Sequence, residues 1–205
     1  MNNIDTIIFD LGGVLIDWNP EYVYLEVFNG DRQKMQWFFD NICTNDWNEN
    51  QDAGYPMAKA TKERIALFPE YEDLIRMFYD RWVDMLGDEI TETVEILDKL
   101  KRSNKYKIVA LTNWSHETFP IALARFEFLH WFEGIVVSGE EQTRKPFTDI
   151  YNITLERYKI NSINSVFIDD NLRNVNAAKE LGINGIHFKN PKLLINQLKS
   201  FNISL

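Results

Sequence analysis

The chain of 205 residues contains little cysteine, little histidine and little positive charge. Its single cysteine, Cys43, excludes an internal disulfide bond and a cysteine-ligated metal site. With no histidine near it in the sequence, Cys43 is better explained as a small buried side chain than as a nucleophile. Lysine and arginine number 22 against 31 aspartates and glutamates, which gives a net charge of −9. Because nucleic-acid binding needs a basic surface, we expect no nucleic-acid partner.

Long apolar runs are also missing. No window approaches the ~20 apolar residues of a membrane-spanning helix, and the first residues, MNNIDTIIFD, lack the basic and apolar regions of a signal peptide. We therefore expect a cytoplasmic protein without a membrane partner, either a monomer or a homodimer. What is present is ordinary globular composition, with 45% hydrophobic residues and six tryptophans, which predicts a well-filled core or an aromatic-lined pocket.

From about residue 88 onward, short apolar runs alternate with amphipathic helical patterns. Including the N-terminal run, strands are expected at 4–9, 107–112, 134–138, 165–168 and 183–188. Helices are expected at 91–101, 119–128, 150–158, 175–181 and 192–200. This alternation predicts βαβ units, and so an α/β fold with a Rossmann-like parallel sheet that has residues 4–9 at its centre.

Residues 19–87 follow a different pattern. They contain aromatic-rich helical segments but no convincing strand, and glycines and prolines separate the segments. The segments are 22–28, 32–42, 57–67 and 71–86. We therefore predict a core domain of residues 1–18 and 88–205, and a helical domain of residues 19–87 inserted after the first strand.

Polar side chains stand at, or shortly after, the ends of four predicted strands. They are Asp10, the pair Thr112-Asn113, Lys145 and the pair Asp169-Asp170. Ligands of open α/β folds bind at the carboxyl edge of the sheet, so in a parallel sheet these residues converge there. Three carboxylates repel one another unless a cation lies between them, and hard oxygen ligands suit Mg²⁺. The set therefore predicts a magnesium site where Asp10 can attack phosphorus while Thr112 and Lys145 hold phosphate oxygens.

The ordered motifs FDLGGVLID, LTNWS, RKP and FIDDN resemble those of the haloacid dehalogenase-like hydrolases and span nearly the whole chain. The resemblance implies a Rossmann-like core with a helical cap inserted after the first motif. It also implies a Mg²⁺-dependent phosphatase that hydrolyses a small phosphorylated metabolite through an aspartyl-phosphate. Within the superfamily, the motifs look similar to a bacterial group that includes an α-D-glucose-1-phosphate phosphatase, which implies a sugar phosphate as substrate.

The same resemblance implies roles for individual residues. Asp10 would be the nucleophile and a Mg²⁺ ligand, and the Gly12 carbonyl would bind the same ion. Asp170 would complete the acidic side, with Asp169 binding the ion directly or through water. The phosphate would be bound by Thr112, Asn113 and Lys145.

Gly12 departs from the pattern, because most phosphatases of the superfamily carry a second aspartate there as general acid and base. Such help is typically worth about 10²- to 10⁴-fold in rate. The proton must then come from the cap, the solvent or the substrate. Two alternatives stay open: a metal-independent 2-haloacid dehalogenase, which needs no such acid, and a weakly active or non-catalytic metabolite-binding protein. The pair Asp169-Asp170 favours the phosphatase.

Other residues allow two interpretations. Asp17 shapes the hinge to the cap rather than replacing the missing acid. His116 is a proton donor or a surface residue, and Asn174 holds the Asp169-Asp170 loop or is simply exposed. The polar segment 44–54 predicts a specificity loop. Stacking on a sugar or plain packing would explain Trp18, Trp47 and Trp114.

Overall fold

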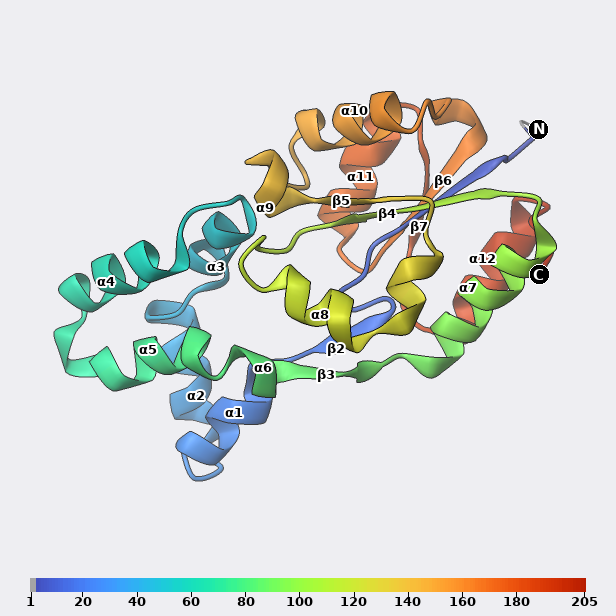
Figure 1. Ribbon diagram of the computed structural model, residues 1–205. Helices are drawn as coiled ribbons and strands as arrows, with labels where there is room; N and C mark the ends of the chain where they lie inside the picture. Colours follow the sequence, from blue (N-terminus) through green and yellow to red (C-terminus); the bar gives the residue numbers. More distant parts are fainter. Residues whose placement is uncertain (1–2) are drawn as a thin grey trace.

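The computed structural model describes residues 3–205, and a five-stranded sheet lies at its centre (Figure 1). The strands are β1 (Thr6–Phe9), β4 (Lys107–Thr112), β5 (Ile135–Val137), β6 (Ser165–Asp169) and β7 (Asn184–His187). They lie in the order β5-β4-β1-β6-β7, and every neighbouring pair is parallel. The predicted α/β fold with β1 at the centre is therefore confirmed. Because β1 pairs with both β4 and β6, the residues that follow these strands meet at one edge.

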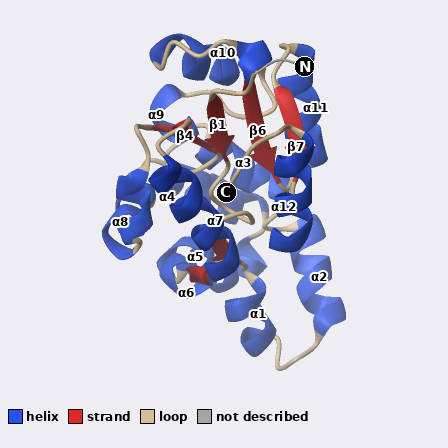
Figure 2. Ribbon diagram, turned by 90° about the vertical axis from the view of Figure 1, so that its right-hand side faces the viewer, coloured by secondary structure: helices blue, strands red, loops and turns tan. Residues whose placement is uncertain are grey.

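Helices cover both faces of the sheet (Figure 2). Along β1, Ile7 and Phe9 belong to the hydrophobic cluster on one face and Ile8 to the cluster on the other. The first face is covered by α7 (Thr91–Ser103), α8 (Phe119–Arg125) and α12 (Pro191–Ser200). The second is covered by α10 (Thr148–Arg157) and α11 (Leu172–Glu180). Strands buried on both faces are continuously apolar, which is why the sequence reveals them.

Short elements complete this part of the chain. They are the one-turn helix α9 (Ser138–Glu141) and the 3-10 helices η2 (Glu127–Trp131) and η3 (Ser162–Asn164). The helix expected at 119–128 ends at Arg125 and is followed by η2. The helix expected at 175–181 begins earlier, at Leu172, because the side chain of Asn171 accepts a hydrogen bond from the backbone N–H of Arg173 and caps it.

Between β1 and β4 the chain leaves the sheet through an antiparallel pair, β2 (Ile16–Trp18) and β3 (Leu86–Glu89). The helices between β2 and β3, here called the insert, are α1 (Glu21–Val27), α2 (Arg32–Asn41), α3 (Asn45–Asp52), α4 (Met57–Leu67), η1 (Pro69–Tyr71), α5 (Glu72–Asp80) and α6 (Trp82–Met85). The insert packs around its own hydrophobic cluster, which includes Tyr24 and Phe38, and forms the left-hand lobe of Figure 1. A division into domains at 18/19 and 87/88 stays a prediction.

Three expectations for residues 19–87 are wrong. The strand β3 begins at Leu86, but its sequence LGDE has no apolar alternation that could announce it. The single helix expected at 71–86 is divided into α5 and α6 at Arg81. The segment 44–54 forms helix α3 rather than a loop, since the Thr44 side chain accepts a hydrogen bond from the backbone N–H of Trp47 and starts the helix.

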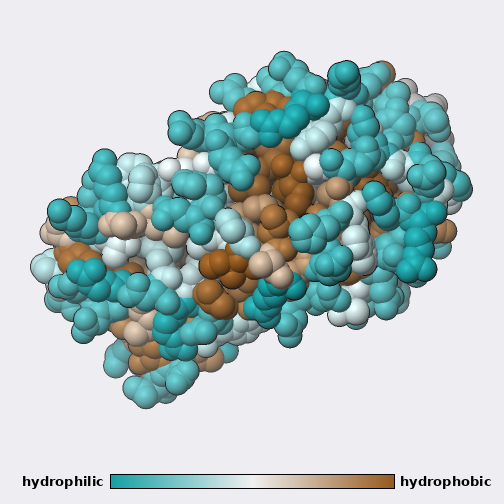
Figure 3. All heavy atoms as spheres, in the orientation of Figure 1, coloured by the Kyte–Doolittle hydropathy of each residue, from teal (hydrophilic) through white to brown (hydrophobic). Residues whose placement is uncertain are grey.

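The surface of the molecule is polar over most of the face drawn in Figure 3, with apolar side chains reaching it mainly near the middle of the view. Within residues 3–205, no helix combines the length and the apolar character that a membrane crossing requires.

Candidate active site

Three carboxylates meet at the carboxyl edge of the central strands. Asp10 directly follows β1, Asp169 ends β6, and Asp170 comes next. One oxygen atom from each carboxylate lies within 4.8 Å of the other two. Asp10 and Asp169 are buried, whereas Asp170 is exposed. The parallel pairing of β1 with β6 is what brings the three together.

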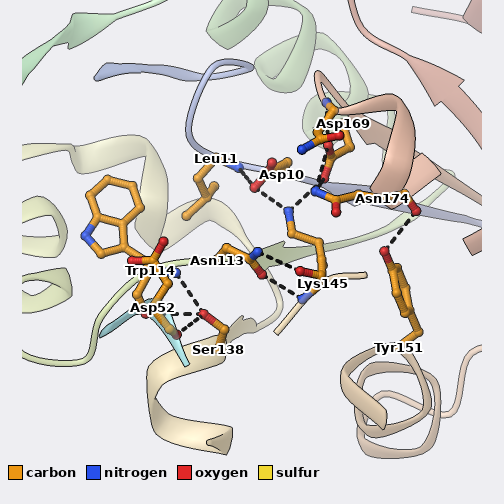
Figure 4. A network of polar contacts seen from close by, with 11 residues as sticks. Asp10, Leu11, Asp52, Asn113, Trp114, Ser138, Lys145, Tyr151, Asp169 and Asn174 are labelled. Carbon is orange, nitrogen blue, oxygen red and sulfur yellow. Dashed lines mark hydrogen bonds and ion pairs between the residues drawn. The ribbon is translucent and has the colours of Figure 1, made fainter. Parts of the chain in front are cut away.

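The ammonium group of Lys145 points into this cluster (Figure 4). Its Nζ lies 2.8 Å from Asp10 Oδ1 and 2.7 Å from Asp169 Oδ2, and the residue is fully buried. Burial by itself lowers the pKa of Lys145, but the two carboxylates raise it above its usual range, so the lysine stays charged. Burial raises the pKa of Asp10, Lys145 opposes this, and Asp169 and Asp170 raise it further. With one ammonium group and three carboxylates, the cluster carries excess negative charge when its groups are ionised, and a bound cation would balance it.

Asp169 is held in place from several sides. Besides Lys145, it accepts a 2.7 Å hydrogen bond from the backbone N–H of Asn171 and two 3.2 Å hydrogen bonds from the side-chain amide of Asn174. Asn174 is buried, and its backbone carbonyl accepts a 2.8 Å hydrogen bond from the hydroxyl of Tyr151. Of the two interpretations of Asn174, the structure supports the one in which it holds this loop.

Asp170 depends on a glycine in the opening motif. Gly13 has a φ of +71°, and a β-carbon built on it would lie 2.4 Å from Asp170 Oδ2. Only glycine tolerates both the left-handed conformation and this close approach. The two glycines of the motif therefore differ, because a β-carbon on Gly12 would meet no atom within 4 Å.

Asn113 and Thr112 lie at the end of β4, next to Lys145. The Asn113 side chain clamps the backbone of Lys145: its Oδ1 accepts from the Lys145 N–H at 2.8 Å, and its Nδ2 donates to the Lys145 carbonyl at 3.0 Å. The Thr112 hydroxyl is fully buried and has no hydrogen-bond partner among the described residues. A buried hydroxyl without a partner is unfavourable, which suits it to a ligand oxygen.

A cavity of about 90 Å³ lies between the insert and the rest of the chain. The insert contributes Asn48, Asp52, Met57 and Trp82. The other side is formed by Gly12, Trp18, Asn113, Trp114 and Thr118. In the part of the chain that the structure describes, the indole N–H groups of Trp18 and Trp114 are buried without a hydrogen-bond partner.

Polar contacts close the insert over this edge of the sheet. Glu49 of α3 forms two ion pairs: its Oε2 lies 2.7 Å from Arg144 Nη2, and its Oε1 lies 2.6 Å from Arg173 Nη2. The Ser138 hydroxyl donates a 2.5 Å hydrogen bond to the carbonyl of Asp52. These contacts join α3 to the loop before Lys145, to α9 and to the start of α11.

Comparison with known proteins shows which family has this arrangement. The family model described as haloacid dehalogenase-like hydrolase matches residues 7–188. The chain belongs to this family. Phosphorylated carbohydrates phosphatase of Thermotoga maritima is 24% identical over 194 residues, which cover 90% of this chain and 84% of that protein. Sesquiterpene phosphatase astK of Aspergillus oryzae is 38% identical over 56 residues, and the match spans only 29% of its length and 27% of this chain.

Solved structures of the family share the fold of this hydrolase. The enzyme bt-2542 of Bacteroides thetaiotaomicron, in a magnesium complex, aligns with a TM-score of 0.69 at 24% identity, over 92% of this chain and 95% of that chain. A dehalogenase in an intermediate complex gives a TM-score of 0.69 at 18% identity, over 92% of this chain and 86% of that chain. These likenesses show the fold alone, and a fold does not decide the chemistry of its site.

Other residues singled out in the sequence of this hydrolase lie in different surroundings. Trp47 packs in the core of the insert, with its ring 5.3 Å from that of Phe78. His116 is exposed. Asp17, in β2, accepts a hydrogen bond from the Tyr22 hydroxyl at the base of the insert. The site roles predicted for Asp10, Gly12, Thr112, Asn113, Lys145, Asp169 and Asp170 stay predictions.

Several residues of the site escape the sequence analysis. Glu49 and Asp52 lie in a polar segment whose composition gives no sign of which side chains face inward. Arg144 has one signal, its place beside Lys145 in the RKP motif, whereas the contact of Tyr151 with Asn174 exists only in the folded chain.

We expect Glu49→Gln to weaken the closure of the insert. The carboxylate is 9% exposed and its partner Arg144 is 14% exposed, so loss of the charge should lower the free energy of unfolding by about 1–3 kcal/mol. Hydrogen exchange should quicken in α3 more than in β1. The matched control is Glu72→Gln, which removes an exposed pair with Arg76 and should change stability by less than about 0.5 kcal/mol. Equal effects of the two variants would contradict the expectation.

Proposed function

We propose that this hydrolase is a Mg²⁺-dependent phosphatase of a small phosphorylated metabolite, a sugar phosphate, acting through an aspartyl-phosphate. The observation that carries the proposal is the meeting of the three carboxylates with the Lys145 ammonium and the unpartnered hydroxyl of Thr112. Carboxylates hold a divalent cation, while an ammonium and a hydroxyl hold phosphate oxygens.

The residues present fit Mg²⁺. All side-chain donors are hard oxygens. Burial of Asp10, and partial desolvation of the carboxyl group of the otherwise exposed Asp170, raise the pKa of each, and their acidic neighbours raise it further. Asp10, Asp169, Asp170 and the Gly12 carbonyl would hold the ion. When bound, Mg²⁺ neutralises charge on the transferring phosphoryl group and orients one of its oxygens.

The residues of the chain divide the rest of the chemistry. The Asp10 carboxylate attacks phosphorus, and the backbone N–H of Leu11, which donates to Asp10 Oδ1 at 2.8 Å, orients it. Lys145 stabilises the charge on the phosphoryl oxygens, and Asn113 positions the Lys145 backbone. The Thr112 hydroxyl donates to a phosphate oxygen.

The cavity supports a hydroxyl-bearing substrate. Its walls combine three tryptophan rings with the amides of Asn48 and Asn113, and two of the indole N–H groups are free to donate. A cavity of about 90 Å³ is smaller than ordinary ligand sites, so the insert must open to admit the substrate. The Thermotoga relative is named a phosphatase of phosphorylated carbohydrates, which agrees with this class.

Hydrolysis of p-nitrophenyl phosphate with and without metal tests the function. We expect turnover in Mg²⁺, its loss in EDTA, and its return when excess Mg²⁺ is added, because the excess of buried carboxylates repels phosphate unless a cation is bound. Turnover that ignores EDTA would contradict the proposal, and halide release from 2-haloacids in EDTA would favour a dehalogenase.

A further inference from the structure

We propose that Asp52, the last residue of α3, protonates the leaving oxygen of the substrate and then activates the water that releases phosphate. The inference rests on the proposed phosphatase function and deepens it. It assigns the proton source that Gly12 cannot provide.

The leaving group creates the need for an acid. An alkoxide that leaves phosphorus is a strong base, and a placed acid speeds its departure by about 10²- to 10⁴-fold. Gly12 offers only free space on the cavity side of the motif. Of the nine described residues that line the cavity, Asp52 is the one with an acidic side chain; the rest are glycine, tryptophan, asparagine, methionine and threonine.

The folded chain holds Asp52 firmly at this place. Its backbone carbonyl accepts a hydrogen bond from the Ser138 hydroxyl, and its carboxylate accepts one from the backbone N–H of Ser115. Three residues earlier, Glu49 anchors the same helix to Arg144 and Arg173. In Figure 4, Asp52 lies beside Trp114, Asn113 and Ser138, on a segment different from that of Asp10. The donor therefore comes from the insert and the nucleophile from β1, so closure assembles the pair.

The surroundings of Asp52 suit acid–base work. Burial raises its pKa to about 7; Glu49 raises it too, whereas Arg144, the Ser115 N–H and Lys145 lower it. Tyr79, on α5, is a second titratable group near Asp52. Burial raises the pKa of this phenol, and the charge of Asp52 raises it further, so Tyr79 stays neutral. An acid whose pKa lies near the working pH can both give and take the proton.

The steps balance. In the first, the Asp10 carboxylate forms a bond to phosphorus, the bond from phosphorus to the leaving oxygen breaks, and that oxygen takes the proton of the Asp52 carboxyl. In the second, water attacks phosphorus and gives a proton to the Asp52 carboxylate, and the bond from phosphorus to Asp10 breaks. At the end Asp10 is again a carboxylate and Asp52 is again a protonated acid, so the cycle consumes only the phosphate ester and water.

The test is Asp52→Asn, which keeps an oxygen that can accept from Ser115 but cannot donate a titrating proton. Phenyl phosphate and p-nitrophenyl phosphate have nearly the same shape, but phenolate is the far stronger base and needs protonation more. In single turnovers with enzyme in excess, which report the first step alone, phenol release should slow about 10²-fold or more, and p-nitrophenol release less than about threefold.

The outcomes separate the two claims. Equal slowing of both substrates would make Asp52 a merely structural residue, and no slowing of either would also overturn the inference. Wild-type enzyme that hydrolyses neither ester in Mg²⁺ would instead refute the proposed function itself. Asp46→Asn, an exposed aspartate on the same helix, is the matched control and should release both phenols at the wild-type rate.

Two further measurements bear on the proton itself. Wild-type phenol release should fall as the pH rises through about 7, because the acid form of Asp52 is lost, and Asp52→Asn should lack this limb. Gly12→Asp has room for its side chain, so adding it to Asp52→Asn should restore phenol release. A double variant no faster on phenyl phosphate than the single one would overturn the inference.

Discussion

Asp10→Asn should abolish turnover, with a loss of about 10⁴-fold or more, because the amide is no nucleophile toward phosphorus. The amide oxygen can still accept the hydrogen bond from the Leu11 N–H, so the turn after β1 is preserved. The variant should also fold at least as well as wild type without metal. Burial raises the pKa of Asp10, so its ionised form opposes folding as the pH rises above the ordinary carboxyl range, and asparagine never ionises.

Both parts of this expectation are measurable. Steady-state hydrolysis of p-nitrophenyl phosphate in Mg²⁺ gives the rate, and urea unfolding in EDTA at neutral pH gives the stability. Asp5→Asn is the matched control, since Asp5 is exposed just before the same strand and should keep the wild-type rate. An Asp10→Asn enzyme whose turnover falls by less than about 10²-fold would remove Asp10 from the role of nucleophile.

Lys145→Met should reduce turnover by about 10³-fold and lower the free energy of unfolding by about 3–5 kcal/mol in EDTA. Methionine is similar to the lysine stem in size, so the cost is not that of a cavity. It arises because Asp10 and Asp169, which each lie within 2.8 Å of Nζ, lose the positive charge between them. Two buried carboxylates then face each other without a counter-charge.

The stability of the Lys145→Met protein should depend on pH and on Mg²⁺. Lys145 lowers the pKa of Asp10, so its loss raises that pKa further. The variant should therefore recover stability as the pH falls and Asp10 takes up a proton, and lose it as the pH rises. Mg²⁺ should reduce the difference in free energy of unfolding between the variant and wild type, because the ion supplies positive charge beside the carboxylates. Lys189→Met, at an exposed lysine after β7, is the control, and a Lys145→Met protein that matches it in urea and in turnover would contradict the expectation.

The strands of the central sheet and the acidic cluster can be predicted from the sequence, because each is marked by a pattern of neighbouring residues. β1, β4 and β6 are apolar runs that end in polar residues, and parallel pairing then leaves few ways to arrange them. The antiparallel pair β2–β3 was not within reach, because β3 is a short charged segment. The polar composition of α3 is typical of a turn and predicts a loop, although Thr44 is a residue type that often caps the start of a helix, as it does here.

What the sequence by itself determined is the family, the α/β core and the set of residues at the carboxyl edge, since each follows from short motifs and apolar runs that can be recognised one at a time along the chain. Only the tertiary structure decided how those residues are supported: the Asn113 clamp on Lys145, the hold of Asn174 on Asp169, and the space left by Gly12. It alone brought Glu49 and Asp52 from the insert to the site. Their contacts join segments up to 124 positions apart in the chain, as between Glu49 and Arg173, and side chains with no local pattern acquire a role only when packing sets their distance and their burial.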